Sequence, residues 1–308
     1  MPTPERYDRH QLEQYYVRVQ VPESARVYDV SSMAADAQLS HLELLVKHQL
    51  VTVPFENLTL HYSWHRVVNT DAHHLFDKIV NQKRGGYCME NNSLFHVVLV
   101  SLGFDVYMAG ARVHESDKTG YGGTTHCLNI ITVGDVRYVT DVGFGPNGPI
   151  RPYVLEPNLE QEHIAPAHVR YRRGQLPGTT NEAGLVWIYE HRQEDTWAPM
   201  YCFADIEILP ADVRTMNLAP STSRTSIFQK IIMCVRFTAG TIQSQVDGDI
   251  DGVVILGASL KWRRHGKEEK QFATETERIE ALEEYFGVVL DSKDQAAIQG
   301  TATAINSP

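Results

Sequence analysis

The sequence predicts an α+β protein built from more than one part, and three observations support this class. Residues 39–50 and 88–102 carry apolar side chains at helical spacing, whereas the apolar side chains from residue 104 onward alternate with a period of two, as in a strand. Beyond residue 210, strand-like runs and an amphipathic helix occur together. The chain has 308 residues, enough for two or three domains. We therefore expect a helical part, a sheet part and an α/β part over residues 1–103, 104–210 and 211–308.

Two helices are expected in the first part. In residues 39–50, Leu42, Leu45, Val46 and Leu50 recur at helical spacing. The second helix is expected from about Cys88 to Leu102, because Leu94, Phe95, Val98 and Leu102 follow the same period. Gly103 stands where the C-terminal cap of this helix belongs.

The middle part is expected to be mostly sheet. Two β-rich runs, LNIITV and VRYVTDV, are joined by Gly134 and Asp135, a two-residue connection that is typical of a hairpin. Residues 156–178 are rich in Pro, Gly, His and Arg, which predicts a long loop between strands.

In the last part, residues 227–240 and 248–264 are expected to be strands around turns. Thr274 to Glu277 have the pattern of an N-terminal cap for an amphipathic helix that ends at Gly287. The residues from about Gln295 are small and polar, so we expect a frayed tail.

The composition is that of an ordinary globular protein, with 43% apolar and 21% charged residues. The formal net charge of −10 predicts repulsion from phosphate backbones and anionic lipids, which makes nucleic acid and membrane surfaces unexpected partners. There is no apolar leader and no run of 18 apolar residues, so a cytoplasmic location is expected.

Cys88 is the candidate nucleophile. It follows two glycines in KRGGYC and stands at the expected helix start. Backbone N–H groups at a helix start stabilise an anion, so a thiol there is expected to ionise below the free thiol pKa of about 8.5. The other cysteines show no CxxC spacing and are expected to be inert core thiols: Cys127, Cys202 and Cys234.

The expected hairpin brings a histidine and a carboxylate together. Its turn places Leu128 opposite Asp141 and His126 opposite Gly143, so His126 and Asp141 are diagonal neighbours on one face. Asp141 would then hold the imidazole in the tautomer that leaves one ring nitrogen for Cys88. The sequence thus predicts a Cys-His-Asp triad.

Four blocks in this order, VPFENL, RGGYCMENN, the TH of GGTTHCLNI and DVGFG, resemble those of the arylamine N-acetyltransferases. The resemblance implies a helical bundle, a central antiparallel β-barrel and an α/β lid, with a cysteine-proteinase-like triad core. It implies ping-pong transfer of a short acyl group, acetyl by default, from acyl-CoA to an arylamine or arylhydrazine. Acyl-CoA is then a cosubstrate, with no tightly bound cofactor and no metal. The triad maps onto Cys88, His126 and Asp141.

The resemblance also implies supporting roles. Phe55 is expected to line the substrate pocket. Glu56, Asn57, Arg84, Glu90 and Asn92 are expected to tie the helix start to neighbouring loops. Coenzyme A is expected to meet a glycine-rich loop and a later Ser/Thr-rich segment, through Gly122, Gly123, Thr124, Thr125, Thr225 and Ser226. Arg224 stands where many relatives have proline, and it is either a contact for a phosphate or acyl carboxylate or a solvated charge.

Other interpretations stay open. The same chemistry with malonyl-CoA or propionyl-CoA as the preferred donor is one, and a transglutaminase-like Cys-His-Asp hydrolase or amidotransferase is another. A catalytically silent binding protein would keep the fold without turnover. A metal site through His61, His65, His73 and His74 is the least favoured, because the HExxH pattern is absent.

Overall fold

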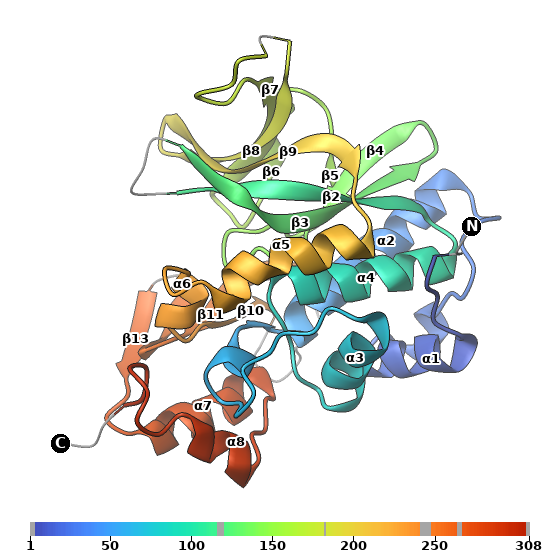
Figure 1. Cartoon of the computed structure of the whole chain (residues 1–308). Coiled ribbons are helices and arrows are strands. Elements are labelled where there is room, and N and C mark those ends of the chain that lie inside the picture. The colour runs from blue at the N-terminus through green and yellow to red at the C-terminus, as the bar shows by residue number, and fades with distance from the viewer. Residues whose placement is uncertain (1–3, 116–119, 182, 241–247, 264–266, 306–308) are drawn as a thin grey trace.

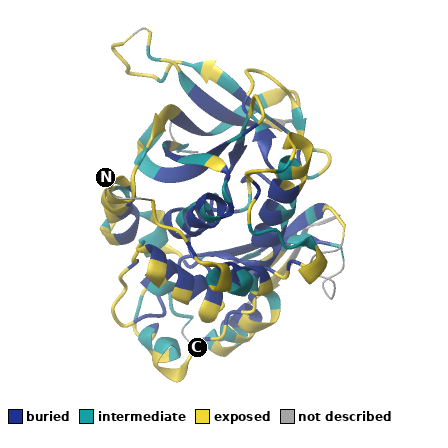
Figure 2. Ribbon diagram, turned by 90° about the vertical axis from the view of Figure 1, so that its right-hand side faces the viewer, coloured by how far each residue is buried: buried dark blue, intermediate teal, exposed yellow. Residues whose placement is uncertain are grey.

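The computed structural model describes residues 4–115, 120–181, 183–240, 248–263 and 267–305. Figure 1 shows a large curved sheet above a layer of helices, with a smaller sheet and the last helices below. In Figure 2 the buried residues gather where these layers meet. The α+β class and the barrel-like antiparallel sheet expected from the sequence are confirmed. The division into residues 1–103, 104–210 and 211–308 stays a prediction.

Helices make up most of the first part. The two expected helices are present as α2 and α4, and α4 ends where Gly103 adopts a positive φ of 87°. α4 is buried along nearly its whole length beneath the large sheet. The helical segments up to residue 102 are α1 (Arg9–Arg18), η1 (Glu23–Ala25), α2 (Ala35–Thr52), η2 (Leu58–Leu60), α3 (Ala72–Phe76), η3 (Asp77–Asn81) and α4 (Cys88–Leu102).

The large sheet has eight antiparallel strands in the order β5-β4-β3-β2-β9-β8-β7-β6. The expected hairpin has the expected register, since Val133 pairs with Val136 across the turn. The outermost strands meet through a side chain, because the Gln161 amide both accepts from and donates to the Val154 backbone, at 2.8 and 3.0 Å. The strands are β2 (Asp105–His114), β3 (Tyr121–Val133), β4 (Val136–Thr140), β5 (Tyr153–Val154), β6 (Gln161–Glu162), β7 (His168–Gly174), β8 (Val186–Gln193) and β9 (Thr196–Glu207).

The long loop expected over residues 156–178 is wrong in part, because it contains β6 and β7. Val169 and Tyr171 of β7 are fully buried, while Arg170 and Arg172 occupy the alternate positions and bind Glu190. Arg173, near the end of the strand, stacks on Trp187. The high charge of the segment therefore concealed an ordinary strand period.

The smaller sheet has the order β1-β10-β11-β12-β13 and joins distant parts of the chain. β1 (Phe55–Glu56) comes from the helical part and pairs with β10 (Cys234–Ala239). The other strands are β11 (Ile250–Leu256), β12 (Ser259–Arg263) and β13 (Lys267–Gln271), and the helices of this part are α5 (Pro210–Thr222), α6 (Ile227–Lys230), α7 (Glu275–Phe286) and α8 (Ser292–Ala297). The expected caps of α7 at Thr274 and Gly287 are present.

Two expectations for the last part need correction. Residues 227–230 form α6 rather than a strand, because the Ser226 side chain accepts from the Phe228 N–H and begins a helical turn. The tail from Gln295 is docked rather than frayed: Ile298 is buried, and the Thr303 carbonyl accepts from Arg278 at 2.9 Å. Arg264 and residues 306–308, which also fell within those expectations, lie outside the described residues. No helix in the described part of the chain combines the length and apolar character needed to cross a bilayer.

Candidate active site

Cys88 is the first residue of α4, and two glycines shape the approach to it. A Cβ on Gly85 would lie 1.9 Å from the Pro54 carbonyl oxygen, and one on Gly86 would lie 2.5 Å from Cβ of Glu90. Only glycine allows these contacts. Glu90, in the first turn, accepts the Tyr87 N–H at 3.1 Å, which fixes the helix start.

His126 and Asp141 meet as the hairpin register predicts. The ring Nε2 of His126 lies 2.6 Å from Oδ2 of Asp141, and both residues are about 99% buried. The other carboxylate oxygen accepts from Asn92 Nδ2 at 2.8 Å and from the Gly143 N–H at 3.0 Å. Asp141 is therefore held from three sides, with its charge directed at the imidazole.

Cys88 acts on the same ring, since its side chain is among the groups that interact with His126. Nε2 faces Asp141, so Nδ1 is the ring nitrogen that remains for the thiol. Burial disfavours the charged ring, but the Asp141 carboxylate and then Cys88 outweigh burial and raise the pKa of His126 to about 10. The thiol sulfur also lies 3.7 Å from the Thr125 carbonyl oxygen. The structure thus brings the three residues of the predicted triad together.

The remaining cysteines lack such an environment. Cys127, Cys202 and Cys234 are buried free thiols. Burial raises the pKa of all three, to about 11 for Cys202. Their sulfur atoms therefore stay protonated near neutral pH.

A buried ionic cluster supports the helix start. Lys78 Nζ lies 2.6 Å from Glu90 and 3.6 Å from Glu56, and Arg84 lies 3.1 Å from Glu56. Burial opposes ionisation of Glu56, yet Arg84 and Lys78 overcome it and lower the pKa to about 2. For Glu90 burial prevails over Lys78, and the pKa is raised. Sequence reasoning found Glu56, Arg84 and Glu90 but missed Lys78, whose surroundings in DKIVN give no sign of burial.

Aromatic rings surround the triad. Phe144 lies 5.2 Å from the His126 ring between centroids, and Tyr201 lies 5.3 Å from it. Phe55, the predicted substrate contact, lies 6.1 Å from Phe228 and lines a small cavity that also borders Asp141. Phe144 stands within the DVGFG block, so its place in the motif was a usable signal. Tyr201 and Phe228 lie outside these motifs, and nothing in the sequence around them indicated a place beside the triad.

The predicted coenzyme A contacts lie on two segments. Gly122, Gly123, Thr124 and Thr125 belong to β3 rather than to an open loop, although the pairing with β2 shifts register at Arg112. A Cβ on Gly123 would meet only the Thr125 methyl, at 3.9 Å, so space remains beside it. Thr225 and Ser226 lie between α5 and α6, and Arg224 beside them is exposed.

The histidines considered as metal ligands do not converge. His61 Nε2 lies 2.9 Å from the Phe228 carbonyl oxygen, and His65 Nδ1 accepts from the Val67 N–H at 3.0 Å. Over the described ranges, no group of three His, Cys, Asp or Glu side chains is arranged to hold a metal ion.

Known proteins match this chain along most of its length. A family model described as N-acetyltransferase matches residues 38–295. The chain is 31% identical to the N-malonyltransferase FDB2 of Gibberella moniliformis, over 95% of this chain and 92% of that protein. It is 26% identical to arylamine N-acetyltransferase 2 of Mus musculus, over 85% and 91%. The arylamine N-acetyltransferase structure from Nocardia farcinica superposes with a TM-score of 0.76 at 28% identity, covering 95% of this chain and 94% of that one. The chain therefore belongs to the arylamine N-acetyltransferase family and is, by class, an acyl-CoA-dependent acyltransferase.

Proposed function

We propose that Cys88, His126 and Asp141 are the catalytic residues of a ping-pong N-acyltransferase that acts on aromatic amines or hydrazines. The observation that carries this proposal is the 2.6 Å contact between buried His126 and Asp141, together with the interaction of Cys88, at the start of α4, with the same imidazole. Asp141 and then Cys88 raise the pKa of this buried imidazole to about 10, so His126 holds its proton at neutral pH and can give it to a leaving group.

In the first half-reaction, the Cys88 sulfur attacks the thioester carbonyl of acyl-CoA. A C–S bond to the enzyme forms, the C–S bond to coenzyme A breaks, and the departing sulfur takes the proton of His126. In the second half, the amine attacks the Cys88 thioester and gives its proton to His126. The amide leaves, and the Cys88–His126 pair is restored.

The acyl donor is acetyl-CoA by default, with malonyl-CoA as the second candidate. The specific observation in favour of malonyl is the 31% identity, over 95% of this chain, to a protein named as an N-malonyltransferase. For the amine, the aromatic lining of Phe55, Phe144 and Phe237 in the small cavity beside Asp141 supports a planar substrate. Because all four cysteines are free thiols, we place the enzyme in the cytoplasm.

Intact-protein mass spectrometry after incubation with acetyl-, propionyl- or malonyl-CoA tests the proposal. We expect one acyl group on the parent chain, its removal on adding an arylamine, and no adduct on Cys88→Ala. Cys202→Ala, which removes another buried thiol, is the matched control and should be acylated like the parent. An adduct that survives in Cys88→Ala, or no adduct with any of the donors, would reject the assignment. The donor with the highest acylation rate identifies the preferred acyl group among the three.

A further inference from the structure

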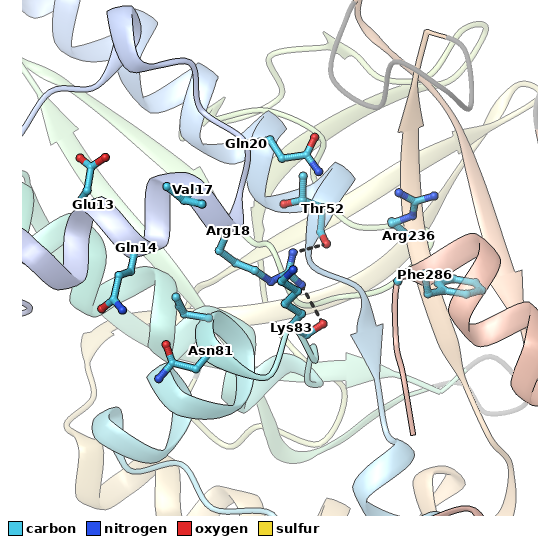
Figure 3. A pocket seen from close by; sticks show the side chains of 12 residues that line it. Glu13, Gln14, Val17, Arg18, Gln20, Thr52, Asn81, Lys83, Arg236 and Phe286 are labelled. Carbon is cyan, nitrogen blue, oxygen red and sulfur yellow. Dashed lines mark hydrogen bonds between the residues drawn. The ribbon is translucent and has the colours of Figure 1, made fainter. Parts of the chain in front are cut away.

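A second pocket lies away from the triad, and its volume is about 500 Å³ (Figure 3). That size falls within the usual range of small-molecule sites, roughly 300 to 1,000 Å³. Its walls come from α1, the end of α2, the end of η3 and the segment after it, β10 and the end of α7. Arg236 lines it from β10, whereas Val235 and Phe237, on the alternate face of the strand, border the cavity beside Asp141. One strand therefore separates the two sites.

The pocket carries an excess of positive charge in a protein whose net charge is −10. Three cationic side chains line it, Arg18, Lys83 and Arg236, and Glu13 is the carboxylate among its lining residues. Glu13 stands at the opposite end from Arg236 in Figure 3 and is bound to Arg26. Within the described part of the chain, none of the three cations forms an ion pair.

The arginines differ in how far their N–H groups are satisfied. Arg18 donates to backbone carbonyl oxygens, of Ile79 at 2.8 Å and of Thr52 at 2.9 Å among others. Arg236 is 94% buried, yet its guanidinium donates to a single described acceptor, the Val51 carbonyl oxygen at 3.2 Å. Its Nε has no partner among the described residues. A guanidinium carries five donors, and a buried one is normally paired.

The electrostatics agree with this geometry. Burial is the main cause that lowers the pKa of Arg236, and the pKa of Arg18 falls to about 10 through burial and through the charge of Arg236. The two arginines thus repel each other across the pocket. An anion placed there would relieve both the desolvation and the repulsion.

The remaining walls are partly apolar. Val17, Val80 and the Phe286 ring line the same space. Val17 is 60% exposed, so this wall is open to incoming molecules. A ligand with an apolar body would cover these side chains while its acid group faces the cations.

We propose that this pocket binds a small organic anion, a carboxylate or a phosphate ester with an aromatic or aliphatic body. Arg236 and Lys83 hold the acid group, Arg18 adds to the positive potential, and Phe286 and Val17 pack against the body. The guanidinium fork of Arg236 suits either planar carboxylate or phosphate oxygens.

The test measures binding to the full chain at constant ionic strength, by calorimetry and by the shift of the melting temperature. Phenylacetate and phenyl phosphate are the probes, inorganic phosphate tests the acid group alone, and benzyl alcohol is the neutral aromatic control. We expect saturable binding of one or both aromatic acids, weaker binding of inorganic phosphate and none of benzyl alcohol. The aromatic acid that binds more tightly identifies the acid group. Binding of neither aromatic acid overturns the proposal.

The variants locate the site. Arg236→Gln should weaken binding at least tenfold. Val17→Glu places a carboxylate on the exposed wall and should weaken it to a similar degree, whereas Val17→Gln, the uncharged match, loses only an apolar contact and should weaken binding far less than Val17→Glu. If Arg236→Gln fails to fold, the comparison of Val17→Glu with Val17→Gln still tests where the anion binds. Equal affinity in Val17→Glu and Val17→Gln, or displacement of the probe by saturating coenzyme A, overturns the proposal. Because the readout is binding, it does not depend on the role of Cys88.

Discussion

Replacing Asp141 by Asn tests the electrostatic core of the triad with almost no change of shape. In the parent chain Oδ1 of Asp141 accepts two N–H groups, from Asn92 and Gly143, and Oδ2 faces His126 Nε2. An amide can keep the first oxygen as an acceptor only by turning its NH2 toward Nε2. The ring atom Nε2 must then accept a hydrogen bond from the amide, so the ring proton moves to Nδ1. With Nδ1 protonated, the ring can no longer take a proton from Cys88.

The size of the effect follows from the pKa of His126. Burial alone would hold this pKa below its ordinary value of 6.5, and Asp141 is the main group that raises it to about 10. Losing the charge therefore destabilises the imidazolium by about 5 kcal/mol, which corresponds to a loss of roughly a thousandfold or more in the proton affinity of the ring. We expect acylation of Cys88 to slow by a factor on the order of 10³ to 10⁴.

Single-turnover acylation by acetyl-CoA, followed by quenched-flow mass spectrometry, measures this rate. Iodoacetamide labelling of Cys88 near neutral pH should slow as well. Asp135→Asn, which makes the same change in the exposed hairpin turn, is the matched control and should keep the parental rates. Urea unfolding confirms that both variants are folded. An acylation rate for Asp141→Asn within threefold of the parent would refute the role given to the carboxylate.

Three further predictions concern stability and access. Lys78→Met leaves the carboxylate of Glu90 buried without its partner, so urea unfolding should show a loss of about 3 to 5 kcal/mol, and a loss under about 1 kcal/mol would contradict the cluster. Gly143→Ala places a Cβ 2.8 Å from Cα of Cys88, so acylation should fall at least tenfold in a protein that still melts cooperatively; an unchanged rate would exclude the close contact. Because the pKa of His126 is raised to about 10, its stabilising contribution is complete below pH 6.5 and is lost as the pH rises to 10. Unfolding free energies measured across that window should fall more in the parent than in His126→Gln, and parallel curves would disprove the shift.

Local patterns were enough to predict some elements to the residue. The limits of α4 were set by Cys88 and Gly103, and the register of the β3–β4 hairpin followed from a two-residue turn. Both depend on contacts between residues near in sequence. The pairing of His126 with Asp141 followed from that register alone, although β4 ends at Thr140 and Asp141 lies one residue beyond it.

Contacts between distant segments were not predictable in this way. Nothing in the sequence around Lys78 indicates that its ammonium group lies between two carboxylates, because one of them comes from β1. Similarly, Tyr201 reaches the triad from β9, far along the chain, where it is one buried tyrosine among several. The family resemblance supplied roles for residues in motifs but could not supply the positions of residues outside them.

The pairing of β1 with β10 has a consequence for biosynthesis. β1 carries Glu56, which helps to hold the start of the nucleophile helix, yet its partner strand leaves the ribosome long after Cys88, His126 and Asp141 have emerged. A nascent chain can therefore display all three reactive residues before their scaffold is finished. We expect fragments that stop short of β10 to be acylation-incompetent and prone to degradation, because the start of the nucleophile helix then lacks part of its support.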